Sequence, residues 1–279
     1  MTIVTKGSGL TASVEPARGG KIVSLIDEAG SEWLAQTDPI FRLADGASFV
    51  ESEMAGWDEC APSIVACTIR GRDVPDHGDL WNTAFDTDGS TVRAFGVSLG
   101  YRFERTITAT DDGVMLHYLA ESVGETVPFL WAAHPQFSAL PGTRVELAAP
   151  ARVVDVLDPK LPISEWSPQL ATIDTVPHEG SRKWFVEPDH PVEAASIVRA
   201  DGSSLTMRWS PTCPYLGVWF DSRAYSREPV IAIEPSTGYF DSLESAVYYG
   251  RVALLTPGAP LAWWVSLQVT TGRTGGPEA

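Results

Sequence analysis

The stretch YRFERTITATDDGVMLHYL, residues 101–119, decides the fold class of this chain. Apolar and polar side chains alternate on both sides of Asp111-Asp112-Gly113, and the flanking segments are rich in β-branched and aromatic residues, as half-buried strands are. An Asp-Gly pair accepts the positive φ angles that a tight hairpin turn demands. The stretch therefore predicts two antiparallel strands joined by a short turn.

The same period-two alternation recurs along most of the chain, as in KIVSLID at residues 21–27. Short turn signals separate the alternating runs, at residues 28–30, 88–89, 141–142, 201–202 and 257–258. Helical spacing of apolar residues is confined to a weak candidate at residues 242–248. The pattern predicts an antiparallel all-β protein with about 15 to 18 strands in two packed sheets.

Composition limits the partners and the domain organisation. The 279 residues include 36 acidic and 20 basic side chains, a formal net charge of −16, which argues against a nucleic-acid partner. No linker rich in Gly, Ser or Pro and no internal repeat divides the sequence. We expect one domain over residues 1–279, with a few flexible residues at each end, and a monomer or a homodimer.

Cysteine usage and hydropathy bear on the compartment. No stretch approaches the roughly 18 continuous apolar residues that span a bilayer, and residues 1–20 carry no apolar segment of signal-peptide length. Three cysteines, Cys60, Cys67 and Cys213, are an odd set without a CxxC pair, which is typical of reduced thiols. We therefore expect a cytoplasmic protein without a membrane partner.

Residues 37–87 interrupt the strand pattern. GWDEC at residues 56–60 and VPDHGDLW at residues 74–81 concentrate aromatic, acidic and imidazole groups in a segment with few clean alternations. Long irregular segments in a compact domain are usually functional or disordered, and this one is too rich in Trp and Phe for disorder. We expect it to cover or line a pocket.

Three ionisable side chains are candidates for chemistry. His77 has neighbouring carboxylates that can hold its tautomer. His134 follows the apolar run FLWAA and precedes a proline, and Glu234 follows VIAI and precedes another, so both are expected at the ends of buried strands. A desolvated Glu234 would have a raised pKa suited to a general base near neutral pH. The remaining histidines, His117, His178 and His190, are expected to have no catalytic role.

Several segments, taken in order, resemble the aldose 1-epimerase (galactose mutarotase-like) family. They are GGKIVSL at residues 19–25, GSEWL at residues 30–34, the His77-Gly78 segment ending in Trp81, Ala133-His134-Pro135, Ile233-Glu234-Pro235, Pro257-Gly258 and Trp263-Trp264. The resemblance covers the chain from about residue 10 to residue 270. It implies a large antiparallel β-supersandwich with a sugar-binding cleft on its concave face, and no cofactor.

The resemblance also implies roles for the three candidates. Glu234 resembles the catalytic base of the family, His134 its general acid, and His77 the second active-site histidine, which contacts the sugar near the ring oxygen. Mutarotation removes the proton of the anomeric hydroxyl and protonates the ring oxygen, which a carboxylate and an imidazolium opposite each other can perform. The implied function is an isomerase, a cofactor-independent aldose 1-epimerase acting on a hexose or related sugar.

Further residues are expected to bind the sugar: Trp81, Asp58, Glu59, Lys183, Arg42 and Trp131. Asp58 and Glu59 place two carboxylates near the expected pocket, and tryptophans offer flat apolar faces on which sugar rings pack. Members of the family that act on free galactose usually carry an Asn-Arg pair early in the chain and an acidic residue later. Arg42 and Lys183 are our candidates for those two positions.

Two interpretations other than a sugar 1-epimerase acting on a free sugar remain open within the same fold. A hexose 6-phosphate 1-epimerase would need a cationic cluster, for which Arg70 and Arg72 are candidates. A non-catalytic carbohydrate-binding protein would need no acid–base pair. It would use flat aromatic faces such as those of Trp57, Trp81, Trp131 and Trp184.

A metal site is a third alternative. Two histidines, His77 and His134, with one carboxylate, Glu59 or Glu234, would suit iron, manganese or zinc. The sequence has none of the close ligand spacing of a zincin or cupin motif. We therefore favour a function without a metal.

Overall fold

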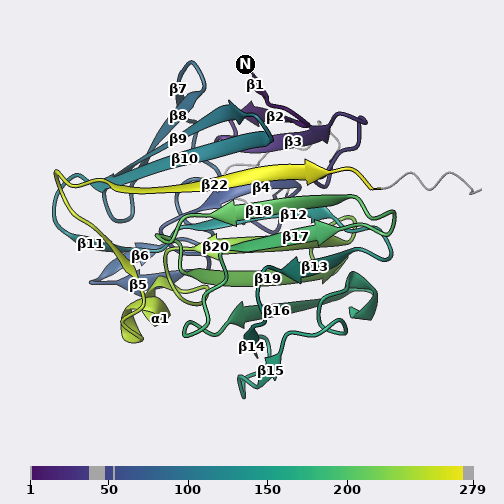
Figure 1. Cartoon of the computed structure of the whole chain (residues 1–279). Helices are drawn as coiled ribbons and strands as arrows, with labels where there is room; N and C mark the ends of the chain where they lie inside the picture. The colour runs from purple at the N-terminus through teal and green to yellow at the C-terminus, as the bar shows by residue number, and fades with distance from the viewer. Residues whose placement is uncertain (1, 38–47, 53, 273–279) are drawn as a thin grey trace, which may run out of the picture.

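The protein is described from a computed structural model, which covers residues 2–37, 48–52 and 54–272. Arg42 and the terminal residues Met1 and 273–279 lie outside the described residues. The described chain forms two large antiparallel sheets, so the all-β antiparallel fold predicted from the sequence is confirmed (Figure 1). No helix of the described residues is long and apolar enough to cross a membrane.

The ten-stranded sheet carries the site described below. In spatial order its strands are β1 (Ile3–Lys6), β2 (Leu10–Glu15), β3 (Lys21–Asp27), β4 (Gly56–Cys60), β12 (Ala132–Ser138), β20 (Val230–Ser236), β19 (Tyr215–Ser222), β16 (Gly180–Val186), β14 (Arg152–Asp155) and β15 (Ile163–Glu165). Strands from all parts of the sequence meet in this sheet. Its centre therefore brings together residues that are distant along the chain.

The eight-stranded sheet packs against one face of the ten-stranded sheet. Its strands are β13 (Arg144–Leu147), β17 (Ala194–Val198), β18 (Ser204–Trp209), β22 (Leu261–Thr270), β10 (Gly113–Ser122), β9 (Tyr101–Thr110), β8 (Thr91–Gly96) and β7 (Asp86–Asp88). β9 and β10 pair from Thr110↔Gly113 to Tyr101↔Ser122, which confirms the predicted hairpin. Its turn lies at Asp111-Asp112.

Short elements complete the fold. Two two-stranded sheets are formed by β5 (Cys67–Ile69) with β6 (Arg72–Val74) and by β11 (Val127–Phe129) with β21 (Ala253–Leu255). The described residues form 22 strands, more than expected, because six strands of only three residues are too short to show an alternation: β5, β6, β7, β11, β15 and β21. The helix candidate is confirmed as α1 (Leu243–Tyr248), whose N-cap Ser242 accepts a hydrogen bond from the Ser245 amide.

The main core lies between the two sheets. Trp131, which precedes β12, packs 4.8 Å from Tyr118 of β10, and Tyr118 stacks on Trp263 of β22 at 5.2 Å between ring centroids. Arg105 of β9 is fully buried and donates a hydrogen bond to Glu59 of β4 at 2.5 Å. These contacts join the two sheets through aromatic packing and one buried ion pair.

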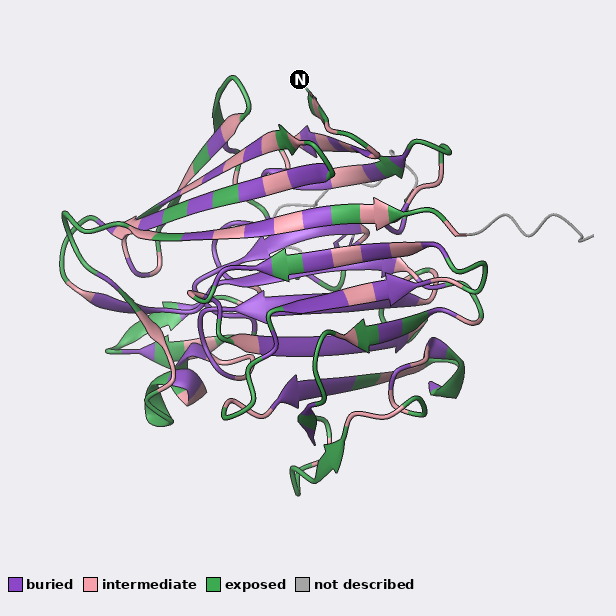
Figure 2. Ribbon diagram, in the orientation of Figure 1, coloured by how far each residue is buried: buried purple, intermediate pink, exposed green. Residues whose placement is uncertain are grey.

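The other face of the ten-stranded sheet is covered as well. Every residue of β4 and β20 is buried, which requires material on both faces of the sheet (Figure 2). A second apolar cluster, separate from the main core, provides part of this cover: Ala35, Phe49, Met54, Trp81, Trp219, Val230 and Ala232. We call this side of the sheet its outer face, and the candidate site lies there.

Candidate active site

Strand register aligns the candidate residues in one row on the outer face. His134 of β12 lies opposite Asp58 of β4. On the other side of β12, the pairs Ala132↔Ser236 and Phe137↔Ile231 set a register that places His134 opposite Glu234 of β20. Residues opposite each other across antiparallel strands point to the same face. Asp58, His134 and Glu234 therefore project side by side.

His134 and Glu234 lie inside their strands and not at the strand ends. β12 continues to Ser138 and β20 to Ser236, although Pro135 and Pro235 lack the N–H that a central strand donates. The pairing of the two strands is interrupted between Ala132↔Ser236 and Phe137↔Ile231, the stretch that contains both prolines. The expectation that each proline ends its strand was wrong, because an interrupted ladder accommodates them.

Glu234 and His134 form a buried pair with a gap between them. His134 Nε2 lies 4.0 Å from Glu234 Oε1, beyond hydrogen-bond distance, and the two residues are 4% and 1% exposed. Oε1 has no hydrogen-bond partner among the described residues. Burial raises the pKa of Glu234 to about 7, against the lowering effect of Lys183 and with a further increase from Asp241. At neutral pH the carboxyl group can therefore both take up and release a proton.

Lys183 ties Glu234 to a second carboxylate. Its Nζ lies 2.8 Å from Glu234 Oε2 and 2.6 Å from Asp241 Oδ1. Burial lowers the pKa of Lys183, but the two carboxylates outweigh burial and raise it above its usual value. Gly217 of β19, opposite Glu234, leaves room for this arrangement, because a Cβ there would lie 3.1 Å from Glu234 Oε2. The lysine therefore neutralises and positions the glutamate.

His134 is held by Gln136, its neighbour on the same face of β12. The Gln136 side-chain amide lies 3.2 Å from His134 Nδ1, and with Nε2 of Gln136 as donor the imidazole carries its proton on Nε2, toward Glu234. Burial lowers the pKa of His134 well below its usual value, and the nearby His77 lowers it further. His134 is therefore a neutral hydrogen-bond donor at neutral pH.

His77 approaches the pair from a turn between β6 and β7. Its Nδ1 lies 2.8 Å from Asp76 Oδ2, and its ring centroid is 5.3 Å from that of His134. Phe49 stacks on His77 at 3.7 Å and meets His134 edge-on at 5.4 Å. Phe49 is 1% exposed, so its ring covers the two imidazoles in this structure.

Asp58 and Trp81 also border this site. Asp58 Oδ2 lies 2.8 Å from Lys21 Nζ, and burial raises the pKa of Asp58 while Lys21 lowers it. Trp81 meets Phe49 edge-on at 5.3 Å and donates from Nε1 to the Asp76 carbonyl. The structure thus brings together His77, His134, Glu234, Asp58, Lys183 and Trp81 from the residues singled out in the sequence.

Glu59 and Trp131 are corrections to the expected sugar-binding set. Glu59 alternates with Asp58 in β4 and points into the main core, where it accepts hydrogen bonds from Arg105, Tyr118 and Trp131. Two other tryptophans considered for a sugar surface, Trp57 and Trp184, also pack in the main core. Residues 56–60 show no clean alternation of apolar and polar side chains, so the sequence pattern does not assign Asp58 and Glu59 to opposite faces.

Several residues of the site were not singled out from the sequence: Lys21, Phe49, Gln136, Trp219 and Asp241. Gln136 could have been found, because it stands two residues from His134 and shares its face of the strand. Trp219 lies opposite Ala232 in the next row of the same sheet and 6.0 Å from the His134 ring. Asp241 follows β20 in a loop, and no local sequence pattern predicts its contact with Lys183.

The alternative sites are not assembled in this structure. Glu59 lies on the opposite face of the sheet from His134. Among the described residues, which include His77, His134 and Glu234, no group of three or more His, Cys, Asp or Glu side chains is arranged to hold a metal ion. Arg70 and Arg72 are exposed and both lie near Glu125, at 3.8 and 3.0 Å. Arg70 also donates to the Thr126 carbonyl. These two arginines therefore do not join the row of site residues.

Comparisons with known proteins place the fold. No protein-family model and no curated protein matched the chain. Among solved structures, a galactose mutarotase-like protein from Lactobacillus casei is similar, with a TM-score of 0.71, 18% identity, and 97% of this chain and 100% of that one covered. A protein from Escherichia coli K12 named as a proposed aldose 1-epimerase has a TM-score of 0.70 and 16% identity, with 97% of this chain and 99% of that one covered. A galactose mutarotase-like protein from Clostridium acetobutylicum has a TM-score of 0.70 and 14% identity, with 96% of this chain and 94% of that one covered. The chain therefore has the galactose mutarotase-like fold that its sequence predicts.

Proposed function

We propose that the protein is a cofactor-independent aldose 1-epimerase, which interconverts the α and β anomers of a hexose or related sugar. The observation that carries this proposal is the buried pair of Glu234 and His134, with 4.0 Å between Oε1 and Nε2 and no hydrogen-bond partner for Oε1 among the described residues. Similar solved structures named as galactose mutarotase-like support a sugar substrate.

The chemistry follows from the protonation states of the pair. Ionised Glu234 removes the proton of the anomeric hydroxyl, the bond between C1 and the ring oxygen breaks, and an aldehyde forms at C1. The Nε2–H of neutral His134 donates a hydrogen bond to the ring oxygen and stabilises the negative charge that develops there. Glu234 then passes its proton to that oxygen. Rotation about C1–C2 and the reverse steps close the ring on the other face.

This assignment differs in one respect from the mechanism that the resemblance implies. An imidazolium acid would require a proton on His134 that burial disfavours, as its lowered pKa indicates. A carboxyl group with a pKa of about 7 accepts and returns a proton with little cost near neutral pH, so Glu234 can perform both transfers. Lys183 and Asp241 keep that carboxylate in place.

Access to the pair depends on Phe49. Its ring stacks on His77 and meets His134, so a sugar that contacts both His134 and Glu234 has to displace this side chain. Trp81 and Trp219 belong to the same apolar cluster and offer the aromatic faces on which a sugar ring packs.

Polarimetry tests the proposal. Freshly dissolved α-glucose, α-galactose and a panel of other aldoses are followed with and without the protein, in a buffer that catalyses mutarotation weakly. We expect faster decay of the optical rotation for at least one sugar. Sugar binding without faster decay for any aldose would instead identify a carbohydrate-binding protein, because binding needs no proton transfer.

A further inference from the structure

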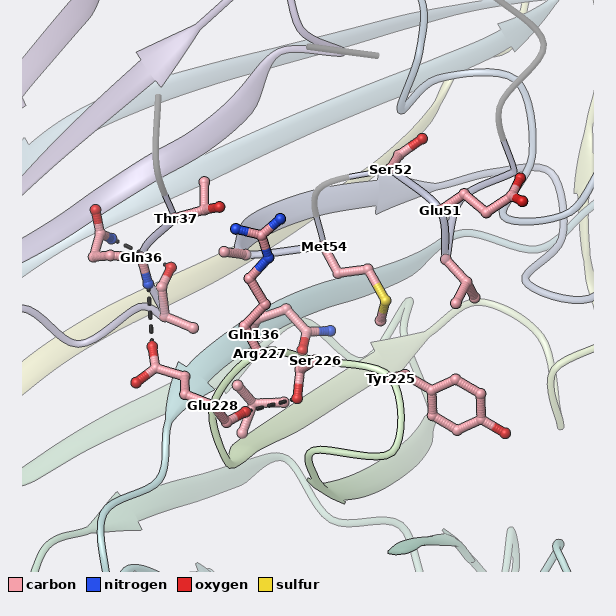
Figure 3. A pocket seen from close by; sticks show the side chains of 14 residues that line it. Gln36, Thr37, Glu51, Ser52, Met54, Gln136, Tyr225, Ser226, Arg227 and Glu228 are labelled. Atoms are coloured by element: carbon pink, nitrogen blue, oxygen red, sulfur yellow. Dashed lines mark hydrogen bonds between the residues drawn. The ribbon is translucent and has the colours of Figure 1, made fainter. Parts of the chain in front are cut away.

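A pocket of about 230 Å³ lies on the outer face beside the catalytic pair. In Figure 3, Gln136 and Met54 lie between Thr37 at one end of the pocket and Tyr225 at the other. The volume is many times the 10–15 Å³ or so that one water molecule needs. The pocket can therefore hold a group much larger than a water molecule.

The pocket begins one step along the sheet from His134 and Glu234. Gln136, Ala232 and Trp219 form the next row on the same face, and Val230 belongs to the row after it. Successive residues on one face of a strand are about 7 Å apart. A ligand whose reacting carbon lies at the catalytic pair would therefore place its next ring over Gln136 and Val230, both of which line the pocket.

Gln136 connects the pair to the pocket. One end of its amide binds His134 Nδ1, and the other end, Oε1, is buried without a hydrogen-bond partner among the described residues. Gln136 is 0% exposed. Thr37 also lines the pocket, and its Oγ1 is likewise buried without a hydrogen-bond partner among the described residues. Both oxygen atoms are acceptors without a donor among the described residues, so each can accept a hydrogen bond from a hydroxyl group of a ligand.

The wall of the pocket is built from a fixed loop. The buried carboxylate of Asp221 accepts hydrogen bonds from the amides of Ala224, Tyr225 and Ser226, at 2.9 to 3.3 Å, and from the Ser226 hydroxyl. This loop presents the Tyr225 ring, 54% exposed and 6.4 Å from the Trp219 ring. The aromatic surface thus continues from the catalytic pair into the pocket.

The chemistry of the lining selects a neutral, hydroxyl-bearing ligand. Apolar groups from Val230 and Met54, an aromatic face and unpartnered oxygen atoms are the surroundings that a sugar ring requires. Two carboxylates, Glu51 and Glu228, and one guanidinium, that of Arg227, also line the pocket. The acidic groups outnumber the basic one, which disfavours a phosphate or another strongly anionic group, and all three can hydrogen-bond to hydroxyl groups.

We propose that this pocket binds the second sugar unit of a reducing disaccharide, whose reducing ring lies at Glu234 and His134. The inference rests on the proposed function for the position of the reducing ring. The pocket itself requires only that a neutral sugar binds there, so binding can be measured apart from turnover.

Calorimetric titration tests the inference with maltose, cellobiose and lactose against glucose and galactose. We expect at least one disaccharide to bind about 3- to 10-fold more tightly than the monosaccharides, the gain from one aromatic contact and one hydrogen bond. Tyr225→Ala and the isosteric Gln136→Met should each remove most of that gain. Tyr248→Ala, on the 83% exposed Tyr248 of α1, is the matched control and should bind like the wild type.

Mutarotation of the same sugars is measured in parallel to separate the two proposals. Tighter disaccharide binding that depends on Tyr225 supports the pocket even if no sugar is epimerised, and the proposed function would then fail alone. Equal binding of mono- and disaccharides by the wild type overturns the inference, whatever the rate of mutarotation. Unchanged disaccharide binding in both correctly folded variants, checked by thermal unfolding, overturns it as well.

Discussion

Glu234 combines burial with a lysine and a second carboxylate, and these opposing influences set its pKa at about 7. In water a glutamate is fully ionised near pH 7, but a weak base with little affinity for protons. The same group at pKa 7 is still half ionised and is a far better proton acceptor. In the proposed function, this environment suits Glu234 to act as a general base in neutral solution.

The pH dependence of the reaction follows from this pKa. In the proposed function Glu234 acts as a base in its ionised form, so kcat/KM for mutarotation should rise with pH and reach half of its plateau at about pH 7. The buffer-catalysed rate, measured without protein at each pH, is subtracted. A kcat/KM that is flat or falls between about pH 5.5 and 8.5 would exclude Glu234 as the base.

Two substitutions should move this midpoint in opposite directions. Lys183 lowers the pKa of Glu234 and Asp241 raises it, so Lys183→Met should shift the midpoint of kcat/KM to higher pH and Asp241→Asn to lower pH. The pH profiles of both variants are compared with that of the wild type. Shifts in the same direction, or none in either variant, would show that these residues do not control the base.

Residue patterns identified His77, His134 and Glu234, and the structure brings these three together. They are detectable because an ionisable group next to a long apolar run is unusual. Their partners are harder to find. Asp241 and Phe49 reach the site from loops, where contact with a distant strand leaves no periodic pattern in the sequence.

At the scale of single elements, the site depends on strands that hold opposing residues in register. β19 leaves space for the Glu234 carboxylate, because the residue opposite Glu234 is Gly217, which has no side chain to fill the space beside Glu234 and the ring of Phe185. Strand alternation would also have assigned Asp58 and Glu59 to opposite faces, had residues 56–60 been identified as the strand β4. The short length of that strand and its polar composition concealed it.

Gly217→Ala tests the need for this space. The added Cβ would lie 3.1 Å from Glu234 Oε2 and 3.2 Å from Phe185 Cζ, so the carboxylate must shift by a few tenths of an ångström. We expect kcat to fall about tenfold, since small displacements of a catalytic group are costly. Gly124→Ala, where a Cβ has open space, is the control and should keep wild-type kcat. Wild-type kcat in Gly217→Ala would show that the base tolerates displacement.

At the scale of the whole molecule, the ten-stranded sheet can present its outer face because its inner face is anchored to the other sheet. Arg105 of β9 reaches Glu59 of β4, directly behind Asp58, and also donates to the Gly20 carbonyl. The hairpin that contains Arg105 could be predicted from the sequence. The order of the strands in both sheets could not, because it is set by packing between segments far apart in the chain.

Loss of this anchor should destabilise the fold. Arg105→Met leaves Glu59 buried without its cation and should lower the free energy of unfolding by about 3 to 5 kcal/mol in urea denaturation. Adding Glu59→Gln should recover part of the loss, because the buried charge is removed while the amide oxygen can still accept from Trp131 Nε1 and the amide NH2 can donate to the Tyr118 hydroxyl. The exposed pair of Arg93 and Glu104 provides the control, and Arg93→Met should cost much less. Equal losses for the two arginines would contradict this account.

The most direct measurement of the central claim is the rate of anomer exchange for the wild type and Glu234→Gln, by exchange NMR on equilibrated sugar at pH 8. The amide keeps the shape of the glutamate but cannot accept the anomeric proton. We expect the wild type to accelerate exchange above the buffer rate and Glu234→Gln to lose at least about 100-fold of that acceleration. Near-wild-type exchange by a correctly folded Glu234→Gln would contradict the claim that this carboxylate performs the proton transfer.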